Sequence, residues 1–219
     1  MFGDAPDPHP LRTLLYDAVD GRFPPVDGAV TVVPELAPGR ECSFAFTGHA
    51  VIATALPPAQ VHARRADGFG PTVLPDFLRW LAGPGGEVHV TDVTLFARGT
   101  GGDRLPSRPD LVDHPRVRFA LGFRDDVRVF GDERGVVTLS RGLAGRPELS
   151  IEAVPEGQGR GWGPSLLVDA MSLVPDGKVV FAAVSPGNAR SLRMFLGRGF
   201  TPIGSETVII IGDEDRSRR

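Results

Sequence analysis

The chain has 219 residues, a formal net charge of −3 and an isoelectric point of about 6.0, so its overall charge gives no reason to expect nucleic-acid binding. Apolar residues make up 41% of the sequence, which is enough for the core of one large domain or two small ones. No apolar run approaches the length of a membrane span, and the N-terminal segment lacks the features of a signal peptide. A single cysteine, Cys42, cannot form an internal disulfide. We therefore expect a cytoplasmic protein.

The N-terminal third carries helix and strand patterns but no motif with an evident chemistry. Apolar spacing and turn residues predict helices over 10–19 and 75–81 and strands over 29–33, 42–56 and 87–97. The strand over 42–56 is expected to be a hairpin, because Thr47-Gly48-His49 interrupts it.

A loop rich in glycine, proline and charge over 99–108 is the best boundary, and it divides the chain into 1–98 and 99–219. Two interpretations of residues 1–98 stay open. They complete the sheet of the C-terminal part, which lacks an evident strand pair after Ile211, or they form a degenerate repeat of it. The repeat rests on a loose similarity between the hairpins at 43–56 and 127–143.

The middle of the chain reads as a β-meander. Strands are expected over 125–130 and 136–139, joined by a hairpin turn, and a helix over 113–121 is expected to begin at Asp113. Residues 148–154 alternate between an apolar face (Leu149, Ile151, Ala153) and a polar face (Glu148, Ser150, Glu152). The polar face is solvent-exposed on the simplest interpretation, and one of its glutamates is a candidate for catalysis.

A glycine-rich hexamer follows this strand: Gln158-Gly159-Arg160-Gly161-Trp162-Gly163. A strand, a glycine turn and a helix N-terminus together make a phosphate cradle, because backbone N–H groups and the helix dipole both favour an anion. A dinucleotide fingerprint would need a further glycine, and a P-loop would need a lysine followed by Ser or Thr. Neither fits, since the chain's only lysine is Lys178. The spacing that fits is Q/R-x-x-G-x-G/A.

The C-terminal third continues with alternating helices and strands. Apolar spacing predicts a helix through 166–174, a buried strand over 179–184 and a second helix over 189–196. Asn188 is expected to cap the second helix, and the terminal strand is expected over 201–211.

The hexamer and the string V-S-P-G-N-A-R-S-L-R-M-F-L-G-R-G-F over 184–200 together resemble the GNAT (Gcn5-related) N-acetyltransferases. The two motifs cover about residues 124–211, under half of the chain. The resemblance implies a mixed α/β fold of the GNAT type, in which a central, mostly antiparallel sheet is flanked by helices. It also implies acetyl-CoA as cosubstrate and a small-molecule or peptide amine as acceptor.

By the same resemblance, acetyl-CoA binds the loop and the elements on either side of it. The implied binding residues are Val154, Gln158, Gly159, Arg160, Gly161, Trp162, Gly163, Asn188, Ser191 and Phe195. The N–H near Val154 is expected to polarise the thioester carbonyl, and Glu148 or Glu152 is expected to act as general base. Phe195 departs from the family pattern, because a tyrosine often stands there as general acid.

That departure keeps other functions open. The chain is an N-acetyltransferase, a catalytically silent acyl-CoA-binding module, or an α/β protein that binds another anion at the same loop. The histidines lack metal-ligand spacing and cysteine pairs are absent, so no metal site is expected. The acceptor stays unassigned and the oligomeric state, a homodimer included, stays open, whereas nucleic acid and membranes are not expected as partners.

Overall fold

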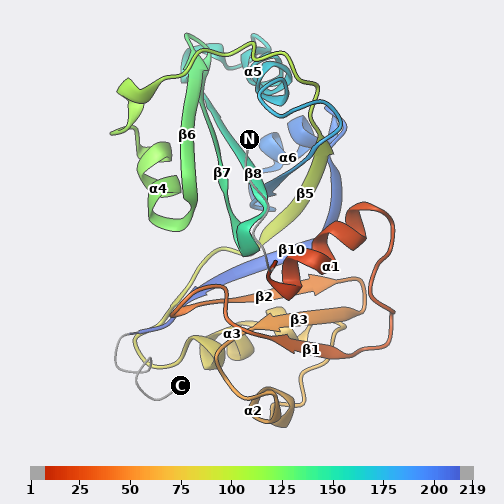
Figure 1. Cartoon of the computed structure of the whole chain (residues 1–219). Coiled ribbons are helices and arrows are strands. Elements are labelled where there is room, and N and C mark those ends of the chain that lie inside the picture. The colour runs from red at the N-terminus through yellow and green to blue at the C-terminus, as the bar shows by residue number, and fades with distance from the viewer. Residues whose placement is uncertain (1–7, 213–219) are drawn as a thin grey trace. The chain divides into compact units, whose positions relative to one another are not determined.

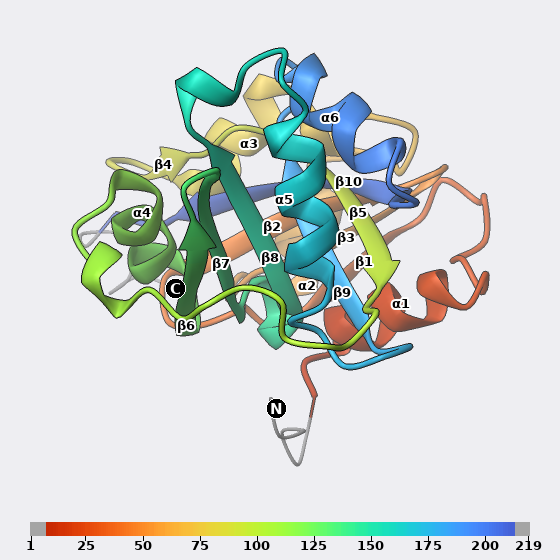
Figure 2. The same cartoon turned by 90° about the horizontal axis from the view of Figure 1, so that it is seen from above.

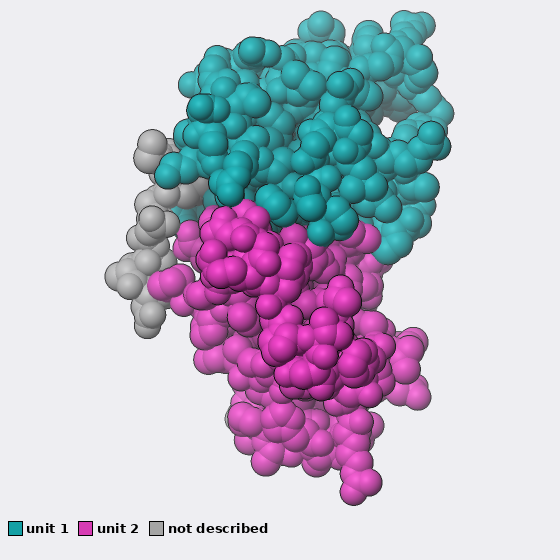
Figure 3. Space-filling view, turned by 90° about the vertical axis from the view of Figure 1, so that its right-hand side faces the viewer, with its two compact units in different colours: residues 1–5, 95–202 teal, residues 6–94, 203–219 magenta. Residues whose placement is uncertain are grey.

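The computed structural model describes residues 8–212 and has a mixed α/β fold, in which mostly antiparallel strands are flanked by helices. The described residues form two compact units (Figure 3). Unit 1 comprises residues 95–202, and unit 2 comprises residues 8–94 together with 203–212. The N-terminal segment in which no signal peptide is expected lies mostly outside the described residues.

Unit 2 contains the helices and strands of the N-terminal third and most of the last strand. Its elements are α1 (Pro10–Val19), β1 (Val30–Val33), β2 (Arg40–Phe46), β3 (His49–Ala53), α2 (Pro58–Ala63), α3 (Pro75–Ala82) and β4 (Glu87–Val88), with most of β10 (Thr201–Ile210). Its strands lie in the order β1-β3-β2-β10, and β4 also pairs with β10. The β1–β3 pair is parallel, and β3–β2 and β2–β10 are antiparallel.

The core of unit 2 follows from amphipathic helices packed on this sheet. In α1, Leu11 and Leu15 are fully buried. In α3, Phe77, Leu78 and Leu81 pack in one cluster with Ile52, Val61, Ala82, Ile209 and Ile211. Prolines occupy the start of α1, α2 and α3. They fit there because the N–H groups of the first helical turn make no intrahelical hydrogen bond.

Unit 1 holds the elements that the glycine loop joins. They are the end of β5 (Asp92–Arg98), α4 (Pro115–Phe123), β6 (Asp125–Asp132), β7 (Gly135–Arg141), β8 (Pro147–Ala153), α5 (Trp162–Met171), β9 (Val179–Val184) and α6 (Ala189–Leu196). Their strand order is β5-β9-β8-β7-β6. Strands β6, β7 and β8 form an antiparallel meander, and β9 runs parallel to β8.

Helices α4 and α5 cover opposite faces of the meander (Figures 1 and 2). Arg116 of α4 is paired with Glu152, whereas Gly163 of α5 lies beside the next residue, Ala153. Successive side chains of a strand point to opposite faces, so these contacts place the two helices on different sides of β8. The loop between β8 and α5 therefore leads from the end of β8 to the face of the sheet that α5 covers.

Most predicted elements are confirmed with shifts of a few residues at their ends. The helix over 10–19, the hairpin at 47–49 and the strand over 179–184 occur as expected. The expected strand over 87–97 is instead two strands, β4 and β5. Helix α4 is capped by His114, whose ring accepts from the N–H of Arg116, and not by Asp113. The division into domains at 98 and 99 stays a prediction.

Candidate functional site

The glycine loop turns sharply at two positions that favour glycine. Gly159 and Gly161 both have φ of +76°, in the left-handed region that side chains with a Cβ rarely adopt. Gly161 is the N-cap of α5, and no side chain caps this helix. An added Cβ at either glycine would meet no atom within 4 Å. The loop is therefore open on the side where these two residues face.

Several N–H groups of the loop are free to bind an anion. Within residues 8–212, no backbone hydrogen bond engages the N–H of Gly159, Gly161, Trp162 or Gly163. Two of these belong to the first turn of α5, where the helix dipole adds partial positive charge. The remaining loop N–H groups are used internally: Gly157, Gln158 and Arg160 donate to carbonyls three residues back at 3.0–3.1 Å. The free N–H groups thus gather at the start of α5, as an anion cradle requires.

The start of α6 lies against the same loop. With the Gln158 amide turned so that its oxygen faces α6, that oxygen accepts from Nη2 of Arg190 at 2.6 Å. Asn188 caps α6, because its Oδ1 accepts from the N–H of Ser191 at 3.1 Å. Helix capping by Asn188 is therefore confirmed, and the N–H of Ser191 is occupied by the cap. The exposed guanidinium of Arg190 adds positive charge beside the loop.

Strands β8 and β9 separate next to the loop. Their parallel pairing is limited to Glu148 and Phe181 in the described chain, although β8 runs on to Ala153 and β9 to Val184. The backbone N–H and C=O groups of β8 point alternately toward β7 and toward β9. The N–H of Val154 donates to the carbonyl of Arg134, the residue just before β7. By alternation, the N–H groups of Ala153 and Ile151 therefore point to the β9 side. These N–H groups face the gap between the strands.

Because of this alternation, the backbone N–H best placed to polarise a thioester carbonyl is one residue earlier than expected. The N–H of Val154, expected to polarise a thioester carbonyl, instead donates to the Arg134 carbonyl at 2.9 Å. The N–H of Ala153 faces the gap and is the better candidate. The sequence contains the signal that identifies it, because the hairpin register of 125–154 fixes which N–H groups face β7.

Glu148 lies buried in an arginine cluster. Its side chain is 3% exposed, and it pairs with Arg124 at 2.6 Å and Arg146 at 3.2 Å. Burial acts to raise the pKa of Glu148, but the charges of Arg124 and Arg146 outweigh it and hold that pKa below its ordinary value. Such a carboxylate resists taking a proton at neutral pH. The polar face of β8 is thus covered at Glu148 and also at Ser150, which is buried, contrary to the expectation of a solvent-exposed face.

Glu152 is the exposed carboxylate of the same strand. It pairs with Nε of Arg116 at 3.1 Å, and both side chains are partly open to solvent. An exposed pair is weak and exchanges readily with water. Glu152 can therefore accept a proton from a substrate or from a bridging water with less reorganisation than Glu148.

The other predicted site residues occupy different surroundings. Phe195 is 4% exposed, and its ring packs edge-to-face on Phe200 with a centroid separation of 4.8 Å, so it is a core residue of α6. Trp162 is half-buried and stacks against Gly157, where an added Cβ would approach the indole within 2.8 Å. The side chain of Arg160 is exposed beside the loop.

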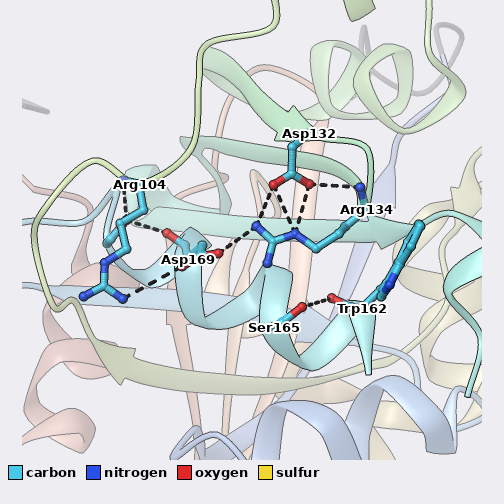
Figure 4. Close-up of polar contacts among 7 residues, drawn as sticks. Arg104, Asp132, Arg134, Trp162, Ser165 and Asp169 are labelled. Atoms are coloured by element: carbon cyan, nitrogen blue, oxygen red, sulfur yellow. Dashed lines mark hydrogen bonds and ion pairs between the residues drawn. The ribbon is translucent and has the colours of Figure 1, made fainter. Parts of the chain in front are cut away.

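A charged network fixes α5 to the β6–β7 hairpin (Figure 4). Nη2 of Arg134 donates to Asp132 at 2.6 Å and to Asp169 of α5 at 2.7 Å. The hydrogen bonds to Arg134 lower the pKa of Asp132, and those to Asp132 and Asp169 raise the pKa of Arg134. The Arg134 carbonyl also holds the N–H of Val154. One residue therefore anchors both ends of the segment that contains the glycine loop. Sequence patterns did not identify it.

Two kinds of site find no support in the described part of the chain. No group of three or more His, Cys, Asp or Glu side chains within residues 8–212 could hold a metal ion. In the same range, no helix has both the length and the apolar character that crossing a membrane requires.

Comparison with known proteins gives structural neighbours only. No family model matches the chain, and no curated protein is similar to it in sequence. A protein described as an acetyltransferase of the GNAT family, from Novosphingobium aromaticivorans, is 17% identical with a TM-score of 0.41 over 59% of this chain and 69% of its own. A GCN5-related N-acetyltransferase from Kribbella flavida is 11% identical with a TM-score of 0.33 over 61% and 63% of the two chains. A protein of unknown function from Staphylococcus epidermidis is 11% identical with a TM-score of 0.41 over 64% and 68%. Because these identities and TM-scores are low, the function has to be argued from the chain's own residues.

Proposed function

We propose that the protein is an N-acetyltransferase that transfers the acetyl group of acetyl-CoA to a primary amine. The observation that carries the proposal is a pair of adjacent features in unit 1. Free N–H groups gather at the start of α5, and the N–H groups of Ile151 and Ala153 line the gap between β8 and β9. The first feature suits a pyrophosphate, and the second suits an extended amide chain that ends in a thioester.

The residues present fit such a ligand. The N–H groups of Gly159, Gly161, Trp162 and Gly163 would hold the pyrophosphate, and the side chains of Arg160 and Arg190 would add positive charge. Open space at Gly159 and Gly161 leaves room for phosphate oxygens. Backbone groups of β8 facing β9 would pair with the pantetheine amides as a further strand would.

When bound, acetyl-CoA supplies an activated acetyl thioester. The N–H of Ala153 would donate to the thioester carbonyl and stabilise the negative charge that develops on it during attack. Glu152 would take the proton of the attacking amine, directly or through water. Glu148 is the weaker candidate for this role, because both of its arginine partners favour its ionised form. Phe195 offers no acidic proton to the leaving thiolate, so thiol release would rely on solvent.

A second function, acyl-CoA binding without turnover, is favoured by two observations. The buried ring of Phe195 leaves the site without the usual phenol, and Glu148 is held in ion pairs. Slow but measurable acetyl transfer is nevertheless expected.

A CoA thiol has a pKa near that of cysteine, about 8.5, so its thiolate is a tolerable leaving group even when no acid protonates it. Loss of a positioned acid lowers the rate of transfer on the order of a hundredfold and does not abolish it.

Thermal unfolding with and without ligand tests the binding site. Acetyl-CoA at a hundredfold excess over its Kd should stabilise the protein by about 2.7 kcal/mol, whereas NADH and ATP should not. Gly161→Glu should abolish the stabilisation, because it places a carboxylate among the N–H groups. Gly177→Glu is the matched control, since Gly177 also has a left-handed φ, of +71°, and open space for a Cβ but lies in the turn before β9. An undiminished shift in Gly161→Glu would contradict the proposal.

Thiol release separates the two functions. The full chain is incubated with acetyl-CoA and a panel of primary amines, and free thiol is measured over time. We expect release above the hydrolysis background that rises with pH as the acceptor amine loses its proton, and that falls in Glu152→Gln. Ligand stabilisation without amine-dependent release would favour the binding module.

A further inference from the structure

A chain of three polar side chains lies in unit 2 and plays no part in the glycine-loop site. Oγ1 of Thr31 lies 2.9 Å from Nε2 of His49, and Nδ1 of His49 lies 3.0 Å from Oδ1 of Asp27. A hydroxyl, an imidazole and a carboxylate in this order form the arrangement that activates a hydroxyl nucleophile: the base contacts the nucleophile and is itself oriented by a third group.

The fold of unit 2 brings the three residues together. Strands β1 and β3 are parallel with Thr31 opposite Val51. His49 stands two residues before Val51 and so shares its face of the sheet, next to Thr31. Asp27 lies in the turn before β1, and its Oδ1 also accepts from the N–H of Ala29 at 2.8 Å. The carboxylate is therefore fixed by the backbone before it meets the histidine.

The hydrogen bonds determine where the protons are. The N–H of Ala29, and then the bond to His49, lower the pKa of Asp27, so at neutral pH its carboxylate only accepts hydrogen bonds. Nδ1 of His49 must then carry the proton of that contact. In the neutral ring, Nε2 holds the lone pair and accepts the hydroxyl proton of Thr31. This tautomer is the one in which a histidine acts as a base toward a hydroxyl.

Burial and strand position separate the roles of the three side chains. The His49 side chain is 8% exposed, and that of Asp27 is 44% exposed. The imidazole is thus buried inside the unit, while half-buried Thr31 keeps contact with the surface.

A backbone N–H beside Thr31 points away from the neighbouring strand. Strand β1 stands at the end of the strand order. The carbonyls of Ala29 and Val33 accept from β3, so by alternation the N–H of Val32 points away from β3. Within residues 8–212 no backbone carbonyl accepts from this N–H, and an N–H one residue after the nucleophile can stabilise an oxyanion.

Two exposed apolar side chains lie next to Gly48, the residue before His49. Val26 is 65% and Phe69 is 64% exposed. An added Cβ at Gly48, the neighbour of His49, would lie 2.5 Å from Cγ1 of Val26 and 3.0 Å from Cε1 of Phe69. Exposed apolar groups beside a polar site suit the hydrocarbon part of a small substrate.

We propose that Thr31, His49 and Asp27 form a second catalytic site, which hydrolyses small esters with an apolar acyl or aryl group. Oγ1 of Thr31 attacks the ester carbonyl while His49 takes its proton at Nε2. The bond to the leaving alcohol breaks, and the alcohol departs with the proton that His49 returns. A water then attacks the acyl group on Thr31, gives a proton to His49 and releases the carboxylic acid. Thr31 regains its proton, so the sum is ester plus water giving acid plus alcohol.

A purely structural role would leave a different signature. In that case the hydrogen bonds only anchor the turn at Asp27 to β3, so substitutions would change stability and no covalent adduct would form on Thr31. The distinguishing measurement is therefore the adduct together with the rate.

The test uses the full chain and p-nitrophenyl acetate as the probe. Wild type should release nitrophenolate above background, and peptide mass spectrometry of quenched reactions should find acetyl on Thr31. Thr31→Val, which keeps the side-chain shape but lacks the hydroxyl, and His49→Gln should each lower the rate about 100-fold or more. Thr31→Ser should retain activity. Thr13→Val and His62→Gln are the matched controls, because Thr13 and His62 are exposed residues of unit 2 outside the site, and they should leave the rate unchanged.

Two results would overturn the proposal. One is hydrolysis by folded Thr31→Val at the wild-type rate, and the other is an acetyl adduct absent from Thr31 in wild type. Should Thr31→Val fail to fold, as judged by circular dichroism, the activity of Thr31→Ser and the wild-type adduct decide the question. The glycine-loop variant Gly161→Glu should keep the esterase activity, which separates this site from the proposed acetyltransferase.

Discussion

Among single residues, the two glutamates of β8 differ most in what their surroundings allow. Glu148 and Glu152 have the same side chain on the same face of one strand. Glu148 is enclosed with Arg124 and Arg146, and Glu152 meets Arg116 at the surface. A buried ion pair whose partner is removed leaves an uncompensated charge, whereas an exposed pair contributes little. The two glutamates should therefore separate stability from activity.

Glu148→Gln should lower the free energy of unfolding at pH 7 by about 3–5 kcal/mol, because two buried guanidinium groups lose their counter-charge. The folded-state pKa of Glu148 is lowered, so its contribution is fully present above the unfolded value of about 4.3 and is lost as pH falls through the folded value. Urea unfolding of wild type and variant over a pH series measures this. The difference between them should be largest near neutral pH and should shrink in acid.

Glu152→Gln is the matched control, since it makes the same chemical change in an exposed pair. It should alter stability by less than about 1 kcal/mol at every pH. Equal losses of stability in the two variants would contradict the assignment of Glu148 to a buried structural cluster.

Residue roles differ in how far the sequence determines them. The cap at Asn188 and the left-handed glycines at 159 and 161 follow from local backbone chemistry, which the sequence contains. The burial of Glu148 does not, because alternation in 148–154 assigns side chains to faces without showing what covers each face. In the structure Arg124, the residue that follows α4, is ion-paired with Glu148. Thr31, His49 and Asp27 are brought together by a parallel strand pair that no local pattern indicates.

Among the elements, α5 depends on a side chain from outside its own sequence. Arg134, in the β6–β7 turn, contacts Asp169 in the last turn of α5 (Figure 4). Its carbonyl accepts from the N–H of Val154 at the start of the loop. The loop between these two points has few internal hydrogen bonds of its own. Its free N–H groups can converge on an anion only if both ends are held in place.

Arg134→Met should therefore weaken CoA binding as well as the fold. We expect a stability loss of about 1–3 kcal/mol, from the charge-assisted hydrogen bonds to Asp132 and Asp169. We also expect an increase of about tenfold in the Kd for CoA, equal to about 1.4 kcal/mol. Urea unfolding and isothermal titration calorimetry measure the two effects.

Arg108→Met is the control for this substitution. Arg108 also pairs with an aspartate two residues away, Asp110 at 2.7 Å, but that pair is partly open to solvent and contains no residue of α5. It should leave CoA affinity unchanged. A similar loss of affinity in both variants would show that general destabilisation, and not the position of α5, controls binding.

Element order was more predictable than strand partners. Apolar periodicity located most helices and strands, since it reports which side of each element is buried. It did not separate β4 from β5, because the break at 89–91 contains no glycine or proline. It also left β10 without identified partners. In the structure β10 pairs with β2 and β4, contacts between residues far apart in sequence that only the assembled fold determines.

Within residues 8–212, the chain passes from one unit to the other twice. Strands β5 and β10 each begin in one unit and end in the other, so unit 2 is built from two separate segments, residues 8–94 and 203–212. Within unit 2, residues Ser205 to Ile210 of β10 face Ala45 to Arg40 of β2. The side chains of Thr207 and Ile209 are fully buried there. A cut at the loop 99–108 therefore removes the partners of β10 along with residues 1–98.

A polypeptide of residues 99–219 should consequently fail to fold cooperatively. Its β10 would expose backbone N–H and C=O groups that β2 and β4 satisfy in the full chain, and it would bare the apolar side chain of Ile209. We expect low soluble yield or a molten state, with strong binding of a hydrophobic dye, retained far-ultraviolet circular dichroism and lost near-ultraviolet signal. The full-length chain under the same conditions is the control, and adding the 1–98 polypeptide during refolding should restore cooperativity. If residues 99–219 alone unfold in one sharp transition and are stabilised by acetyl-CoA, the C-terminal part is an independent domain and residues 1–98 are not needed to complete its sheet.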